Sequence, residues 1–220
     1  MKKVLMVLTN TDNIDDDRDT GLWLPEFVEP YVELKNNGFI VDVASINGGS
    51  IPIDPFSVGE EEQPDTWKEA TLELNTTLVL SQLNVQEYSG IFLPGGHGTM
   101  FDFPYNNTLK NTLAHFAENN KVIGAVCHGS AGLVGAKLST GKWIVDGKRL
   151  TGFTNEEEQQ TGLDSLMPFL LESKLREQGA NFEKLAAFSN HVVVDENFVT
   201  GQNPQSSQST AEAFVKELNR

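Results

Sequence analysis

The chain has 220 residues, 39% of them hydrophobic and 21% charged, as in an ordinary soluble globular protein, and this length fits one domain over residues 1–220. Its formal charge of −15 disfavours phosphate backbones and anionic lipid, so no nucleic-acid or membrane partner is expected. A single cysteine excludes an internal disulfide, and no apolar run approaches the ~20 residues of a membrane span. We therefore expect a cytoplasmic location.

Apolar runs bounded by turn residues alternate with amphipathic stretches, which is typical of an α/β fold with a mostly parallel sheet. Strands are predicted at residues 3–8, 39–44, 89–93 and 121–126, and a hairpin at 191–200. Helices are predicted at residues 23–35, 108–118, 166–178 and 206–218. The acidic stretch 59–65 predicts an exposed loop. The site is expected at the carboxyl ends of the strands, where three segments arrive: Thr9–Asn10, Pro94–Gly96 and Cys127–His128.

Cys127 stands between an apolar strand and a run of small residues that predicts a helix start. Ala125 and Gly129 flank it two residues away on either side, the spacing that a nucleophile elbow requires. A thiol at a helix N-terminus and next to the His128 imidazole should be stabilised as thiolate. The pattern therefore favours an activated nucleophile, which attacks small carbonyl compounds, over an inert buried thiol.

A glycine turn follows the strand at 89–93 and supplies backbone that a ligand can approach closely. The amides of Gly96 and His128 are the predicted donors to an oxyanion, with Gly95 and His97 as further substrate contacts. His115 and His191 are predicted to be structural. No histidine and carboxylate stand at ligand spacing, so no metal is predicted. The sequence has no dinucleotide fingerprint or P-loop, and no cofactor is predicted.

The segment Ala125–Gly129, with Pro94–Thr99 and Phe101–Asp102 upstream, resembles the ThiJ/PfpI superfamily of class I glutamine-amidotransferase-like folds. Further segments are similar to its heat-shock chaperone branch, whose members act as glutathione-independent glyoxalases (glyoxalase III): residues 20–26, 52–55, 150–158 and 199–204. The resemblance implies a three-layer αβα sandwich around a mostly parallel, flavodoxin-like sheet with a nucleophile elbow. It also implies a homodimer.

The resemblance further implies that Cys127 is the nucleophile, that His128 is its partner and that Glu26 points at the sulfur. The acidic third member of the triad should be Glu158, with Glu157 as the alternative. Two aromatic residues, Trp23 and Phe153, are expected to contact the substrate; if they cap the site together with Phe101, they would exclude a polypeptide.

The implied reaction converts methylglyoxal or a similar 2-oxoaldehyde to a 2-hydroxy acid. Cys127 adds to the aldehyde to give a hemithioacetal, a proton moves to the next carbon through an enediol, and water hydrolyses the resulting thioester. His128 is the expected proton shuttle, and Glu26 is the alternative base. Other functions stay open with the same cysteine or surface: a stress-response holdase for unfolded proteins, a cysteine peptidase or amidase, a protein deglycase, and a redox sensor with a Cys127 sulfinate.

Overall fold

A seven-stranded sheet forms the centre of the computed structural model, which describes residues 2–59 and 64–220. The strand order is β10-β11-β7-β6-β1-β4-β5, and all neighbours are parallel except the hairpin pair β10–β11. The strands are β1 (Lys3–Leu8), β4 (Ile40–Ser45), β5 (Leu78–Val79), β6 (Gly90–Leu93), β7 (Val122–Val126), β10 (Val192–Asp195) and β11 (Phe198–Gly201). This arrangement confirms the predicted mostly parallel, flavodoxin-like sheet.

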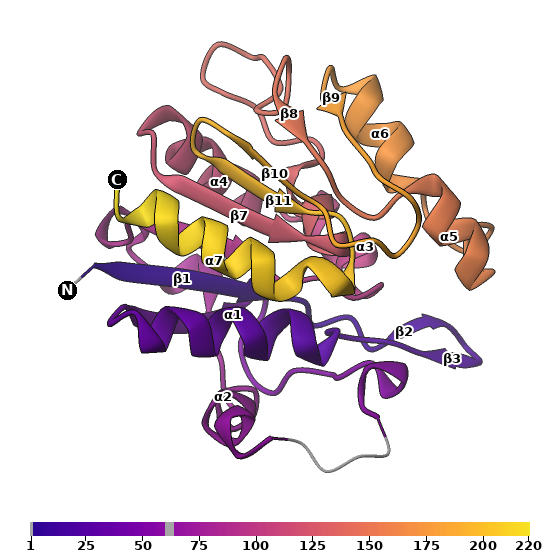
Figure 1. The fold of residues 1–220 in the computed structure, drawn as a ribbon, viewed down its shortest axis with the longest axis horizontal. Helices are drawn as coiled ribbons and strands as arrows, with labels where there is room; N and C mark the ends of the chain where they lie inside the picture. The colour runs from indigo at the N-terminus through magenta and orange to yellow at the C-terminus, as the bar shows by residue number, and fades with distance from the viewer. Residues whose placement is uncertain (1, 60–63) are drawn as a thin grey trace.

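Helices cover both faces of the sheet and make the predicted three layers (Figure 1). Helices α1 (Leu24–Asn36) and α7 (Ser207–Leu218) pack against each other on the near face, while α4 (Asn107–Glu118) lies behind β7. Edge-on packing of Phe92 against Phe214, with ring centroids 5.2 Å apart, joins the sheet to α7. In the described ranges no helix is long and apolar enough to cross a membrane.

Shorter elements complete the described fold. Two small sheets are β2 (Asn13–Asp15) with β3 (Arg18–Asp19), and β8 (Arg149–Leu150) with β9 (Asn181–Phe182). The remaining α-helices are α2 (Lys68–Glu73), α3 (Thr99–Asp102), α5 (Asn155–Thr161) and α6 (Leu171–Glu177). The 3-10 segments are Pro55–Ser57, Asp65–Trp67, Leu80–Gln82, Val85–Glu87, Phe103–Tyr105, Cys127–Leu133 and Pro204–Ser206.

The structure differs from the sequence-based elements in several places, and two of these have a plain physical reason. The helix predicted at 166–178 begins only at Leu171, because Pro168 disfavours helical geometry at the residue before it and cannot donate a backbone hydrogen bond. The β2–β3 hairpin was not predicted, since its acidic segment has no apolar alternation. Within the acidic stretch 59–65, residues 60–63 lie outside the described residues, and the described positions are exposed.

The carboxyl ends of β1, β6 and β7 point to the same edge of the sheet, at the right of Figure 1. The β2–β3 hairpin extends beyond this edge on one side, and α5 lies beyond it on the other. The three segments that the sequence places after strands therefore meet here, as the rule for parallel sheets predicts.

Candidate active site

Cys127 lies on a strained turn at the end of β7. Its φ is +56°, in the left-handed region that non-glycine residues rarely adopt. Two residues later, a Cβ on Gly129 would lie 2.1 Å from the carbonyl oxygen of Leu93, so only glycine fits. The tight elbow predicted from the spacing is present. The segment that follows it, Cys127–Leu133, is a 3-10 helix rather than the expected start of an α-helix.

A hydrogen-bonded chain joins the sulfur to an acid. The Cys127 Sγ lies 3.4 Å from His128 Nδ1, and His128 Nε2 lies 2.6 Å from an oxygen of Glu158. All three side chains are at most 3% exposed. The structure therefore brings together the cysteine, the histidine and the glutamate that the sequence singled out, in the order of a nucleophile, a base and a group that orients the base.

The adjacent Glu157 has a different task, which separates the two candidates for the acid. Thr154 and Glu157 form a reciprocal capping box that starts α5. The other oxygen of Glu157 accepts hydrogen bonds from the Phe188 amide and from the side-chain amides of Gln202 and Asn203. Glu157 thus holds distant segments together, and Glu158, one position later, faces His128.

A second imidazole shares the same carboxylate. His97 Nε2 lies 2.8 Å from the other oxygen of Glu158, and the ring centroids of His97 and His128 are 4.1 Å apart. Burial alone would raise the pKa of Glu158, but its contacts with the imidazoles of His128 and His97 outweigh burial and lower that pKa. Because an ionised carboxylate has no proton to give, both Nε2 atoms must be the donors. In the neutral form of His128, Nδ1 is then unprotonated and faces the thiol.

The same three side chains could also hold a metal ion. His97, His128 and Glu158 offer ligand atoms within 4.8 Å of one another, a grouping that could hold an ion. The statement that no histidine and carboxylate pair at ligand spacing is therefore wrong, because the pairing joins segments 61 and 30 residues apart in the chain. That no metal is needed stays a prediction.

Glu26 is fully buried in the first turn of α1. One carboxyl oxygen accepts the amide of Gly95 at 2.8 Å, and the other has no hydrogen-bond partner among the residues that the structure describes. Burial raises the pKa of Glu26 to about 8, although the Cys127 side chain and the Gly95 amide both act to lower it. At neutral pH this carboxyl is therefore mostly protonated, with a proton available to the sulfur beside it.

Burial opposes the resting thiolate that the sequence predicts. It raises the pKa of the Cys127 thiol, and a negative charge on Glu26 would raise that pKa further, whereas the His128 amide lowers it. Because Glu26 is mostly protonated at neutral pH, its repulsion of the sulfur is weak there, and its proton can stabilise a thiolate. Burial, followed by the charge of His97, lowers the pKa of His128, so its imidazole is neutral at neutral pH. A resting thiolate stays a prediction.

The glycine turn supplies backbone donors, with one change from the prediction. The Gly95 amide already bonds to Glu26, so it does not serve the substrate. Gly96 has a φ of +109°, and a Cβ there would lie 2.2 Å from the Gly21 oxygen, which requires glycine. The Thr99 hydroxyl lies 2.8 Å from the carbonyl oxygens of both Gly96 and His128, and so links the two loops that carry the candidate oxyanion donors.

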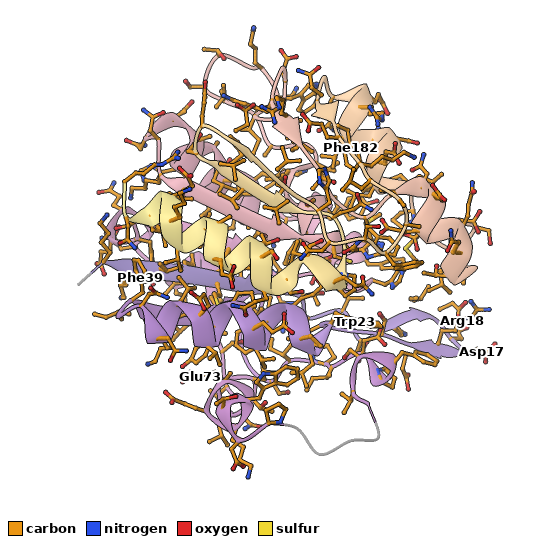
Figure 2. The ribbon with its side chains drawn as sticks, viewed as in Figure 1. Asp17, Arg18, Trp23, Phe39, Glu73 and Phe182 are labelled. Carbon is orange, nitrogen blue, oxygen red and sulfur yellow. The ribbon has the colours of Figure 1, made fainter. Side chains whose placement is uncertain are left out.

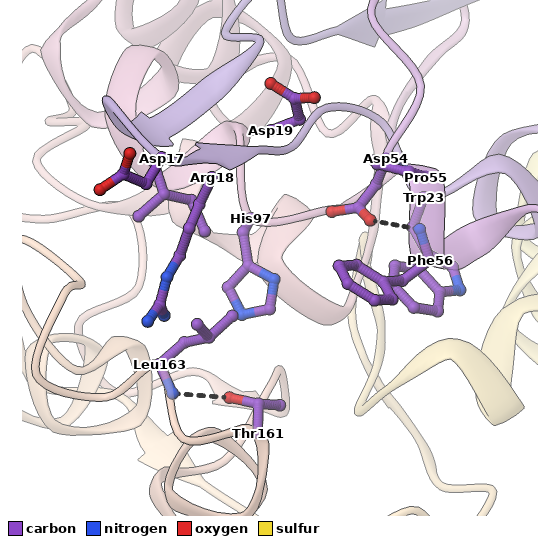
Figure 3. A pocket seen from close by; sticks show the side chains of 11 residues that line it. Asp17, Arg18, Asp19, Trp23, Asp54, Pro55, Phe56, His97, Thr161 and Leu163 are labelled. Atoms are coloured by element: carbon purple, nitrogen blue, oxygen red, sulfur yellow. Dashed lines mark hydrogen bonds between the residues drawn. The ribbon is translucent and has the colours of Figure 1, made fainter.

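A cavity of about 590 Å³ opens next to this centre (Figure 3). His97 and Trp23 form its inner wall, and their contact with substrate stays a prediction. Phe153 is 4% exposed and packs behind the imidazoles, with its ring centroid 4.3 Å from that of His128; its contact with substrate stays a prediction. Phe101 does not line this cavity. His115 lies on α4 and His191 precedes β10, away from the centre.

Sequence reasoning missed the outer part of the cavity, which comes from the β2–β3 hairpin and from Pro55–Ser57. Arg18 and Phe56 both line this outer part (Figure 3), and Figure 2 shows Arg18 at the tip of the hairpin. The adjacent Pro52–Pro55 segment was noticed only as part of the resemblance. No local pattern in the sequence marks either residue as belonging to a site.

Comparison with known proteins assigns the chain to a family. The family model for the DJ-1/PfpI family matches residues 20–217. The chain belongs to the DJ-1/PfpI family. Among curated relatives in this family, the glutathione-independent glyoxalase HSP31 of Saccharomyces cerevisiae is 31% identical, covering 99% of this chain and 98% of that protein. Glyoxalase 3 of Candida albicans is 30% identical, with 98% of each chain covered.

Similar solved structures agree with this assignment. The Rapid Encystment Protein of Francisella tularensis superimposes with a TM-score of 0.93 at 38% identity, covering 99% of each chain. Glyoxalase III of Candida albicans gives a TM-score of 0.89 at 28% identity, covering 98% of this chain and 97% of the other. The resemblance stated from the motifs is thus confirmed across almost the whole chain.

Proposed function

We propose that this protein is a glutathione-independent glyoxalase that converts methylglyoxal or a similar 2-oxoaldehyde to a 2-hydroxy acid. The observation that carries the proposal is the position of the Cys127 thiol, 3.4 Å from an unprotonated imidazole nitrogen and beside the buried Glu26. Relatives named as glyoxalases, similar over their full length, support the same reaction. A homodimer, a cytoplasmic location and one domain over residues 1–220 remain predictions.

In the first step, the sulfur adds to the aldehyde carbon. His128 Nδ1 accepts the thiol proton as the sulfur–carbon bond forms, and Glu26 stabilises the developing thiolate with its own proton. The amides of Gly96 and His128 are the donors for the oxyanion. His128 then returns the proton to this oxygen, which gives a neutral hemithioacetal.

In the second step, a proton leaves the former aldehyde carbon and an enediol forms. The pKa directions favour His128 as the base, because its imidazole is neutral whereas Glu26 is mostly protonated at neutral pH. The hydroxyl proton on the former aldehyde carbon passes to the ketone oxygen, and the proton taken from carbon is returned to the former ketone carbon, which yields the thioester of a 2-hydroxy acid. One carbon is oxidised by two electrons and its neighbour is reduced by two, so the step is redox-neutral.

In the last step, water attacks the thioester, releasing the 2-hydroxy acid and the Cys127 thiol. The carboxylate of Glu158 keeps the imidazole oriented through both proton transfers, because it bonds to Nε2 while Nδ1 accepts and returns the proton. The overall reaction adds one water to the 2-oxoaldehyde.

The test is incubation of the wild-type protein and Cys127→Ala with methylglyoxal, without glutathione, while lactate is measured. Lactate is expected from the wild type only. Circular dichroism and thermal melting check that the variant is folded. Lactate from both proteins, or from neither, overturns the proposal.

A further inference from the structure

The cavity beside the active site is much larger than methylglyoxal. Its volume of about 590 Å³ lies within the range of pockets that hold drug-sized ligands. Methylglyoxal has three carbons and two oxygens, and fills on the order of 100 Å³ if each heavy atom takes somewhat less than the ~30 Å³ of a water molecule. A substrate of that size would leave most of the cavity to solvent.

The cavity meets the reacting centre along its inner wall. His97 lines it and bonds to Glu158, the carboxylate that orients His128. Trp23 lines it too, and its amide bonds to the carbonyl oxygen of Gly95, whose own amide holds Glu26. Cys127 itself does not line the cavity. Because His97 and Trp23 connect the cavity to the centre through Glu158 and Gly95, we place the aldehyde carbon at the sulfur and the substituent on the ketone carbon in the cavity.

An aromatic ring stands at the cavity without a role in the fold. Phe56 is 85% exposed, the highest fraction among the large apolar side chains that the structure describes as exposed. Its backbone is nevertheless held: the buried Asp54 accepts the Phe56 amide at 2.9 Å and the Thr20 hydroxyl at 2.9 Å. Figure 3 shows Phe56 and Trp23 among the side chains that line the cavity. A fixed loop thus presents an apolar ring to the cavity, where a ligand could cover it.

The charges at the cavity argue against an anionic substituent. Asp17, Asp19 and Asp54 line it, against the single guanidinium of Arg18. The Arg18 side chain extends across the cavity toward Leu163 in Figure 3, and among the described residues it makes no ion pair. A neutral apolar group avoids the carboxylates, can pack on Leu163 and Phe56, and can lie under the guanidinium if it is aromatic.

We propose that this glyoxalase is selective for 2-oxoaldehydes whose ketone carbon bears an apolar group the size of an aromatic ring, and that Phe56 is a specificity-determining residue. The inference rests on the proposed function and adds the substrate class to it. The bonds that form and break are those of the methylglyoxal reaction, with the ring in place of the methyl group.

The test compares phenylglyoxal with methylglyoxal in the wild type, in Phe56→Ala and in the matched control Tyr105→Ala. Tyr105 is an aromatic residue that is 61% exposed and does not line this cavity. Initial rates of mandelate and lactate formation give kcat/KM for each substrate. In the wild type, phenylglyoxal should exceed methylglyoxal about tenfold, and Phe56→Ala should lower this ratio about tenfold. The loss should fall on KM, because Phe56 does not touch the reacting atoms.

Tyr105→Ala should keep the wild-type ratio. If Phe56→Ala leaves the ratio within about twofold of the wild type, or raises it, while lactate still forms, the inference on substrate class is overturned and the proposed function stands. If the wild type turns over neither compound, both are overturned.

Discussion

Two regions at the same edge of the sheet are built in opposite ways. The inner centre consists of Cys127, His128 and Glu158, each at most 3% exposed and joined to the next by a hydrogen bond. The rim consists of Arg18 and Phe56, both exposed, on a two-stranded hairpin and a 3-10 segment. Chemistry that moves protons needs groups fixed in a dry environment, whereas selection by size needs only a surface that the substrate can cover.

Electrostatics divides the two regions in the same way. In the centre, burial raises the pKa of Glu26 to about 8 and also raises the pKa of the Cys127 thiol. At the rim, solvent and salt screen the charges of Arg18, Asp17 and Asp19 over short distances. Substitutions in the centre should therefore change rate, pH dependence and stability together, and substitutions at the rim should change selectivity alone.

The largest effect is expected from Glu158→Gln. The amide cannot accept both Nε2–H groups with its two ends, so one imidazole loses its partner and the tautomer that leaves His128 Nδ1 free is no longer enforced. Turnover of methylglyoxal should fall about 10⁴-fold, similar to the loss of an orienting carboxylate in triads. Steady-state kinetics with lactate detection measures it.

Glu156→Gln is the matched control for this prediction, because Glu156 is exposed on the first turn of the same helix. It should turn over methylglyoxal like the wild type. Equal activity of the two variants would mean that the carboxylate in the centre does not orient the base.

Phe153→Ala should cost about 3 kcal/mol of unfolding free energy, because it removes a buried ring that packs on His128 and on Phe188. Urea denaturation of the wild type and the variant gives the difference. A loss below about 1 kcal/mol would show that the inner centre is less tightly packed than its burial indicates.

Glu26→Gln should flatten the pH dependence of stability. The folded pKa of Glu26, about 8, lies above its ordinary value of 4.5, so its contribution is fully present below about pH 4.5 and is lost as the pH rises through 8. A glutamine stays neutral. Between pH 6 and 8 the variant should therefore gain about 2 kcal/mol relative to the wild type, as measured by denaturant unfolding.

The control for this measurement is Glu33→Gln on the same helix, at a half-buried position in contact with Asn37. Its unfolding free energy should follow the wild-type pH curve. Parallel curves for the wild type and Glu26→Gln would contradict a protonated Glu26.

The inner centre could be predicted largely from the sequence because its signals are local. The small residues around Cys127 mark the elbow, and the glycine turn follows an apolar strand within a few positions. The acid Glu158 came from the resemblance over residues 150–158, and its choice over Glu157 needed the capping geometry of α5. Small residues around the nucleophile recur wherever a nucleophile stands on a tight strand-to-helix turn.

Other features of the centre depend on burial and on contacts between distant segments. The spacing of residues in the sequence reveals neither. The bond between His97 and Glu158 spans 61 residues. The raised pKa of Cys127 follows from full burial beside Glu26, and a motif that predicts a helix N-terminus gives the opposite direction. The β2–β3 hairpin that carries Arg18 has no alternating apolar pattern, so the rim became visible only in the folded chain.

The smallest effect is expected at the rim, and it separates the two regions most directly. Phe56→Ala removes a ring as large as that of Phe153, but one that is 85% exposed, so the unfolding free energy should change by less than about 0.5 kcal/mol. Urea denaturation alongside Phe153→Ala measures both under the same conditions. Two phenylalanines, one packed behind the imidazoles and one lining the cavity, would then differ several-fold in their contribution to stability. A cost comparable to that of Phe153→Ala would mean that the Phe56 ring is packed into the fold, and the rim could no longer be treated as a surface available to the substrate.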